Sequence, residues 1–278
     1  MSTRLVWLML GLLLSGFLVG GAAAADAPTR LPSIVVQRNV EVRHFYGYAR
    51  VLASGKYAYT EVHEQYRRDG RWIGGAVTYF APDGTRLGTK VIDFPPGADI
   101  PLYHLDLDHP QYTAGVSRVS PDSVYLFRQQ PGEAAPQQTK IARHAAMTAG
   151  RVGLERFIAT RLAGFAPKAT REIWLAMPGE LDARTFRITR LADGSEGGAI
   201  VVRFKVERTS LLRLLDDEPM FFDFDGATGS LLEYRGPSEI RDPQSGKRYR
   251  VRVTYGDKPP ADAPARLPPL EAGPPPAR

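Results

Sequence analysis

Residues 57–65 alternate tyrosine, acidic and imidazole side chains in a pattern that suits proton-transfer chemistry. If this segment is a strand, one face carries five of them, because successive side chains of a strand point to opposite sides: Tyr57, Tyr59, Glu61, His63 and Gln65. Where such a face lines a cleft, a carboxyl and an imidazole act as general acid and base, or bind a ligand. On an ordinary solvated face they would instead pair with Lys90 or Arg86 of a neighbouring strand. The sequence favours a solvated face for these residues and keeps a cleft as the alternative.

A second polar cluster has the side-chain types of a metal site. His104, Asp106 and Asp108 would share one face of an extended segment. With His109, the cluster resembles the metallo-β-lactamase signature with one His replaced by Asp, but only His144 follows it as a further imidazole. We therefore expect an exposed polar strand end before Pro110, with neither a metal nor another cofactor.

Three arginines form a row near the end of the chain. Arg248, Arg250 and Arg252 alternate with Tyr249, Val251 and Val253, so their guanidinium groups would lie about 7 Å apart along one strand face. Such a row suits the phosphates of a lipid or of lipopolysaccharide. A charged edge or outer face that discourages aggregation is the simpler interpretation.

No established catalytic motif accompanies these clusters. The chain has no Gly-x-Ser-x-Gly elbow, His-Glu-x-x-His helix, Walker loop or dinucleotide fingerprint, and it has no cysteine for a thiol nucleophile. A pair of carboxylates can hydrolyse glycosides without a recognisable spacing, and four acidic residues are candidates: Glu61, Asp93, Asp106 and Glu233. The sequence favours a non-catalytic protein and keeps a hydrolase as an alternative.

The elements that must position these side chains are predicted to be antiparallel strands. Period-two alternation and four Asp-Gly pairs, typical of hairpin turns, define two meander groups at 43–128 and 184–255. The clearest strands are expected at 57–66, 73–80, 86–94, 186–191, 199–207, 220–224, 230–234 and 248–255. The fold class is therefore mainly β, a curved antiparallel sheet or half-barrel.

A single helix should join the two groups, at about 150–165. Its apolar residues recur at helical spacing, and Gly164 is placed to end it. A helix packed on a curved sheet can enclose an apolar cavity; four residues would then contribute to the cavity wall: Phe157, Ile158, Leu162 and Trp174. The alternative is a helix that only covers the sheet.

Both ends of the chain differ from this 26–256 domain. Residues 1–25 carry Arg4, an apolar run and a small-residue stretch, as in a cleavable signal peptide, so we expect a mature protein from about Asp26 without a transmembrane segment. The net charge of +6 would then fall to +5. Residues 257–278 are rich in proline and predict a disordered tail. Export to a bacterial periplasm or medium makes nucleic acid an unexpected partner.

The order of elements resembles that of an uncharacterised family of exported β-rich bacterial proteins. The resemblance rests on four segments, 57–61 (YAYTE), 82–85 (PDGT), 186–188 (FRI) and 231–242 (LLEYRGPSEIRD). More loosely, the chain is similar to periplasmic half-barrels that carry lipids or lipoproteins, which implies a binding role but assigns no residues. We therefore expect an envelope protein that binds an apolar or amphiphilic molecule. The alternatives are a hydrolase of envelope substrates that uses Glu61 and His63, and a structural module that binds envelope proteins.

Overall fold

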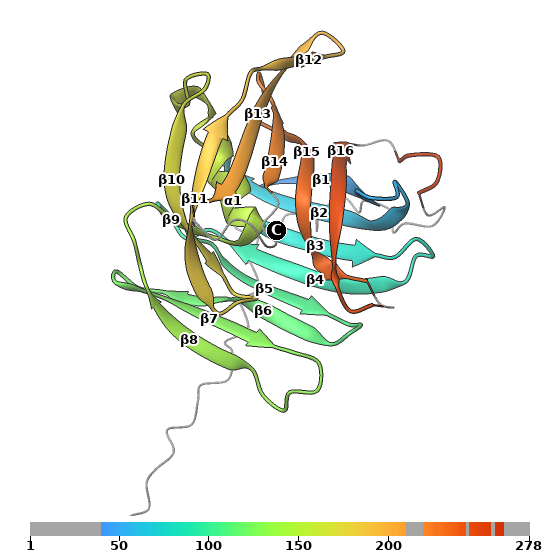
Figure 1. Cartoon of the computed structure of the whole chain (residues 1–278), viewed down its shortest axis with the longest axis vertical. Coiled ribbons are helices and arrows are strands. Elements are labelled where there is room, and N and C mark those ends of the chain that lie inside the picture. The colour runs from blue at the N-terminus through green and yellow to red at the C-terminus, as the bar shows by residue number, and fades with distance from the viewer. Residues whose placement is uncertain (1–39, 210–218, 243–244, 257–258, 264–278) are drawn as a thin grey trace, which may run out of the picture.

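The computed structural model describes residues 40–209, 219–242, 245–256 and 259–263, and these form one continuous curved sheet around one α-helix. The strands are β1 (Glu41–Val51), β2 (Tyr57–Arg68), β3 (Arg71–Phe80), β4 (Arg86–Asp93), β5 (Leu102–Leu107), β6 (Tyr112–Val119), β7 (Ser123–Gln129), β8 (Gln137–Ala142), β9 (Met147–Ala149), β10 (Thr170–Met177), β11 (Asp182–Arg190), β12 (Gly194–Glu196), β13 (Ala199–Arg208), β14 (Met220–Asp225), β15 (Leu231–Arg241) and β16 (Arg248–Gly256). The helix α1 spans Gly150–Ala159 and lies inside the curve of the sheet (Figure 1). The predicted fold class, a mainly β protein with one central helix, is confirmed.

The two predicted strand groups join into a single sheet through the first and last strands. The order is β8-β7-β6-β5-β4-β3-β2-β1-β16-β15-β14-β13-β11-β10-β9, with β12 attached to β13. Neighbours pair antiparallel except β9 and β10, which are parallel. Because β1 pairs with β16, the inner faces of both groups border one shared core.

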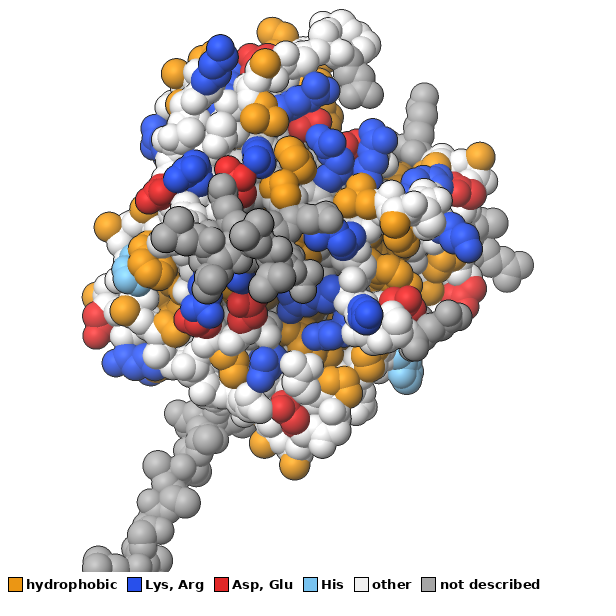
Figure 2. Space-filling model, viewed as in Figure 1, with side chains coloured by type: hydrophobic (Ala, Val, Ile, Leu, Met, Phe, Trp, Pro, Cys, Tyr) orange, Lys and Arg blue, Asp and Glu red, His pale blue; other side chains and the backbone are white. Residues whose placement is uncertain are grey.

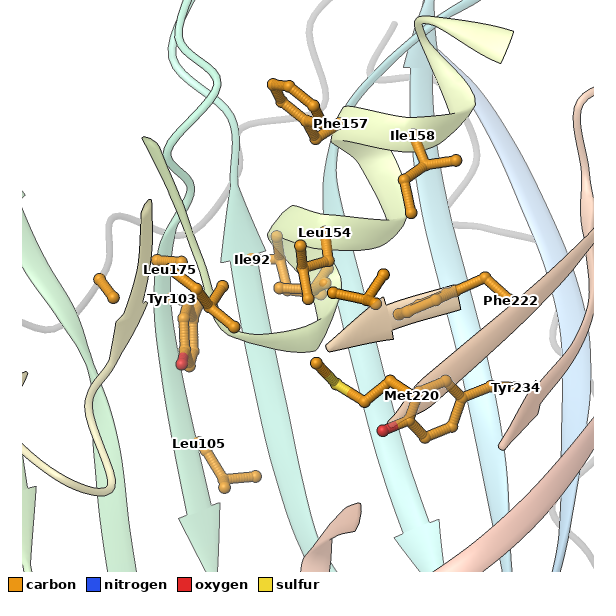
Figure 3. Close-up of a cluster of buried hydrophobic side chains, with 14 of the residues drawn as sticks. Ile92, Tyr103, Leu105, Leu154, Phe157, Ile158, Leu175, Met220, Phe222 and Tyr234 are labelled. Carbon is orange, nitrogen blue, oxygen red and sulfur yellow. The ribbon is translucent and has the colours of Figure 1, made fainter. Parts of the chain in front are cut away.

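The alternation predicted from the sequence decides which side chains form that core. On β13, Val202, Phe204 and Val206 are buried, and on β16 Val251 and Val253 are buried while the residues between them are more exposed. The helix buries Leu154, Phe157 and Ile158 against this face; Figure 3 shows them among side chains from β4, β5, β10, β14 and β15.

The helix is shorter than predicted. It ends at Ala159, and residues 162–164 form a separate 3₁₀ turn. The backbone leaves the helical region at Arg161 (φ −125°), whose guanidinium pairs with Asp99 at 2.7 Å. Gly164 therefore ends the 3₁₀ turn and not the helix.

The ends of the chain contribute little to the described structure. The predicted leader, residues 1–25, and most of the predicted tail, 257–278, lie outside the described residues. Within 259–263, the Asp262 carboxylate forms an ion pair with Arg50. No helix in the described part of the chain has the length and apolar character needed to cross a bilayer.

Candidate functional site

The face that carries Glu61 and His63 points into the molecule. Residues 59, 61 and 63 of β2 lie opposite Ala49, Gly47 and Phe45 of β1, on the concave side of the sheet. Glu61 is fully buried, and the His63 side chain is 13 % exposed. A side chain at Gly47 would place its Cβ 3.1 Å from a Glu61 oxygen. The solvated face favoured by the sequence is therefore not what the structure has.

Arg151, in the first turn of α1, meets Glu61 across this interior. One Arg151 Nη2 proton is donated to Glu61 Oε1 at 2.8 Å, and His63 Nε2 lies 2.8 Å from Glu61 Oε2. Tyr255 of β16 completes the group, since its hydroxyl donates to Glu61 Oε2 at 3.2 Å and accepts from Arg151 Nη1 at 2.7 Å. We call these four residues the inner ion-pair cluster. They link α1 to both halves of the sheet.

The ionised groups of this cluster stabilise one another. Burial disfavours an ionised Glu61, but the adjacent Arg151 charge and the His63 hydrogen bond outweigh it and lower the Glu61 pKa to about 2. Burial lowers the pKa of His63, against the opposing effect of Glu61. A carboxylate fixed by an arginine is a poor proton donor or acceptor near neutral pH. The geometry therefore suits an anchoring role for Glu61 better than acid–base catalysis.

Glu155 is a carboxyl that the sequence analysis missed. It lies one helical turn after Arg151 and lines the gap between α1 and β2–β4. Burial raises its pKa to about 7, although Arg151 opposes this shift. The i, i+4 spacing of Arg151 and Glu155 on a predicted helix was the available signal, because such residues are neighbours on a helix surface.

A second buried ion pair lies farther along the interior. Lys90 of β4, which is 1 % exposed, contacts Glu239 of β15. Beside it, the Tyr59 and Ser238 hydroxyls form a hydrogen bond of 2.7 Å. The sequence predicted that Lys90 would pair with residues 57–65 on a solvated face. Lys90 lies instead on the inner face, and its partner comes from the far half of the sheet.

Next to these pairs is a partly open cavity of about 230 Å³. Its wall is mostly apolar and comes from β5, β6, β10, β11, β14 and β15; the main contributors are Leu105, Tyr112, Ala114, Leu175, Phe186, Met220 and Tyr234. Arg151 borders it at the helix, and Arg208, Arg248 and Arg250 border it elsewhere. A largely apolar space edged by guanidinium groups is able to hold a molecule with an apolar part and an anionic part.

The predicted arginine row is divided by this cavity. Arg248 and Arg250 border the cavity, whereas Arg252 pairs with Glu233 at 2.5 Å on the outer face. Among the described residues, the Arg248 guanidinium has no hydrogen-bond or ion-pair partner. Figure 2 shows Lys and Arg side chains spread among hydrophobic ones across the middle of one face of the molecule.

The four predicted wall residues are not part of that cavity. Phe157 and Ile158 lie in the solid core beneath α1, and Leu162 packs at its margin. Trp174 is half-buried between the inward-pointing Ile173 and Leu175, and its ring stacks on His144 at 3.9 Å. The predicted helix–sheet contact is present, but the cavity lies nearer the N-terminal end of the helix.

The candidate metal residues do not converge. His104 packs on Phe127, with ring centroids 5.0 Å apart. Asp106 is exposed, and Asp108 pairs with Arg86 at 2.9 Å. No group of three or more metal-ligating residues occurs among the residues that the structure describes.

Comparisons of this chain with protein-family models, with curated proteins and with solved structures find no match. The geometry of the cavity and of its charged border is therefore the basis for the function proposed below.

Proposed function

We propose that this chain is an exported binding protein for an anionic amphiphile. The observation that supports the proposal is the 230 Å³ cavity, whose wall is mostly apolar and whose border carries Arg248 and Arg250. The apolar end of the ligand would lie against Leu105, Tyr112 and Met220. Its acidic group would lie beside the arginines, where a guanidinium binds a carboxylate or phosphate through paired hydrogen bonds.

The volume of the cavity limits the size of the ligand. An apolar cavity of about 150 Å³ accommodates benzene, so 230 Å³ suits one short acyl or alkyl segment and not a whole phospholipid. Each methylene group removed from water contributes roughly 0.8 kcal/mol. The leader-like sequence at residues 1–25 supports a ligand from the bacterial envelope or periplasm.

Displacement of a fluorescent fatty acid tests the proposal. We expect decanoate and decyl sulfate to displace the probe about tenfold more effectively than decyltrimethylammonium, because only the anionic head groups pair with arginine. Ala114→Leu, which fills part of the cavity, should weaken the binding of decanoate. Equal displacement by the cationic amphiphile would contradict the proposal.

The arginine row supplies a matched pair of variants. Arg248→Gln removes a guanidinium at the cavity and should weaken decanoate binding, while Arg252→Gln removes one on the outer face and should not. Thermal melting of both variants checks that they fold. If the two variants bind decanoate alike, the acidic group does not lie at Arg248.

A further inference from the structure

A large groove lies at the opposite end of β16 from the cavity. The cavity is bordered by Arg248 and Arg250 at the start of this strand, whereas the groove is bordered by Tyr255 and Gly256 at its end. The groove encloses about 1440 Å³ between the β2–β3 hairpin, residues 93–99, the second half of α1 and the β14–β15 turn. It is separate from the proposed amphiphile site, since the inner ion-pair cluster lies between them.

One wall of the groove is a strip of alternating guanidinium and aromatic groups. Arg67 lies opposite Trp72 in the β2–β3 pair. The Trp72 and Phe94 rings meet edge to face with centroids 5.0 Å apart, and the Arg156 guanidinium lies 4.2 Å from the Phe94 centroid. The strip therefore combines two cations with two aromatic surfaces.

The cations of this strip lack acidic partners. Within the described residues, Arg67 and Arg156 form no ion pair, and the Nε atom of each is buried without a hydrogen bond. Arg156 donates only to the Ala98 carbonyl, at 2.6 Å. A guanidinium without an acidic partner can instead pair with an anionic group of a ligand.

The neighbouring strand β1 repeats the combination. Arg43 lies over the ring of Phe45, 5.2 Å from its centroid, and donates a hydrogen bond to Ser230 but forms no ion pair among the described residues. Phe45 stacks on His63 and touches Tyr255. Cation–aromatic pairs thus line the groove on β1 as well as at Phe94.

Acidic side chains line the same groove and narrow the choice of ligand. They are Asp69, Asp93, Asp99, Glu155 and Asp225. A nucleic acid offers at most one hydroxyl per nucleotide to these five carboxyl groups, whereas a sugar chain offers several on each ring. The same carboxyl groups accept hydrogen bonds from hydroxyls.

We propose that the groove binds an acidic saccharide, a chain of sugar rings that carry carboxylate groups. The unpaired guanidinium groups of Arg67, Arg156 and Arg43 bind the sugar carboxylates, because their planar donors match that geometry. The rings of Trp72 and Phe94 pack on the apolar faces of the sugars. The carboxyl groups of the groove accept hydrogen bonds from sugar hydroxyls.

Titration of the full-length chain with three oligomers tests this inference. The probes are tetragalacturonate, the neutral maltotetraose and an eight-residue oligothymidylate. The readout is Trp72 fluorescence in a background in which Trp7 and Trp174 are replaced by Phe. We expect tetragalacturonate to bind about tenfold more tightly than either other oligomer. Only tetragalacturonate has both carboxylates that pair with the arginines and several hydroxyls on each ring that donate to the carboxyl groups of the groove. Prior saturation with decanoate should leave this binding unchanged, so the result does not depend on the proposed amphiphile function.

Two guanidinium variants locate the site. Arg67→Gln should weaken tetragalacturonate binding at least about fivefold, as expected for the loss of one charge-assisted contact, and should leave folding intact because Arg67 has no bonded partner in the described residues. Arg118→Gln is the matched control, since Arg118 also stacks on an aromatic ring, 3.8 Å from the Tyr125 centroid, but lies outside the groove. The inference is overturned if tetragalacturonate fails to bind at millimolar concentration, if oligothymidylate binds equally well, or if both variants lose affinity alike.

Discussion

Glu61 keeps a full negative charge in the buried interior because Arg151 reaches it from α1. The ionised pair is stabilised by His63 and Tyr255, so every polar atom of the carboxylate has a partner. Burying both charges is costly, and replacing such a pair with apolar residues often changes stability little, whereas removing one partner leaves an uncompensated charge. This asymmetry makes the pair testable by single and double substitution.

Arg151→Met should destabilise the protein strongly, by about 3–5 kcal/mol, since Glu61 then remains buried and unpaired. The double variant Arg151→Met/Glu61→Gln should lose clearly less stability, because no unpaired charge then remains in the core. Urea unfolding of the parent, both single variants and the double variant measures the coupling. Additive effects would mean that the two side chains do not stabilise each other.

Glu155 should make stability depend on pH near neutrality. Its pKa rises from an ordinary value of 4.5 to about 7 in the folded protein, where it faces Arg151, Glu61, Lys90 and Arg43. Between these values the folded chain holds a proton that the unfolded chain has lost, so stability from this group is complete below pH 4.5 and is lost as pH rises to 7.

The Glu155→Gln variant isolates this effect from the other titrating groups. Relative to the variant, the parent should lose stability between pH 4.5 and 7, at up to about 1.4 kcal/mol per pH unit. Unfolding free energies of both proteins at the two pH values give the difference. A difference that stays constant between pH 4.5 and 7 would show that Glu155 ionises normally.

At the scale of the element, α1 is positioned by packing and by Arg151 more than by its own ends. Ala149 gives the helix no side-chain cap, and no acidic residue occupies its first turn. Such a ten-residue helix is marginal in isolation. Its buried residues and the inner ion-pair cluster therefore fix its place on the sheet.

Close packing at Gly153 should outweigh helix propensity. Alanine favours a helix by about 1 kcal/mol over glycine, yet a Cβ at this position would lie 2.3 Å from Thr148 Oγ1 and 3.2 Å from Pro101. We expect Gly153→Ala to lower the melting temperature, whereas Gly164→Ala, with its nearest neighbour at 3.8 Å, should have little effect. A stabilised Gly153→Ala variant would contradict this packing.

Elements with a clear apolar face were predictable from the sequence, and those without one were not. Strand β16 alternates Val251 and Val253 with arginines, and its predicted range differs from the observed one by a single residue. Strand β8 exposes most of its side chains and pairs only with β7, so it has no alternating signal of burial. Strands β8, β9 and β10 fall outside both predicted groups.

The site was predictable only in part, because its contacts join distant segments. Alternation placed Glu61 and His63 on one face, but which side of the sheet is covered depends on α1, about 90 residues later. The wall of the cavity comes from six strands, and its border includes the arginines of β16. Local spacing identifies the face of a residue and does not identify its partner across the core.

At the scale of the whole molecule, the pairing of β1 with β16 turns two strand groups into one sheet. Six residue pairs, from Tyr46–Gly256 to Val51–Val251, form this junction. The inner ion-pair cluster crosses it too, since Glu61 belongs to β2 and Tyr255 to β16. Neither group has a core of its own, because buried residues of both belong to a single cluster.

The sheet should therefore unfold as one cooperative unit. Trp72 lies in β3 of the first group and Trp174 in β10 of the second half, so each reports on one half. With Trp7 replaced by Phe, single-tryptophan variants that retain Trp72 or Trp174 should show coincident urea transitions in fluorescence, which is the test of two-state behaviour. Charge reversal at the junction, Arg50→Glu on β1, would contact Asp262 unfavourably and should shift both transitions equally. Two separate midpoints would show instead that each strand group folds alone and that the β1–β16 junction is only a docking contact.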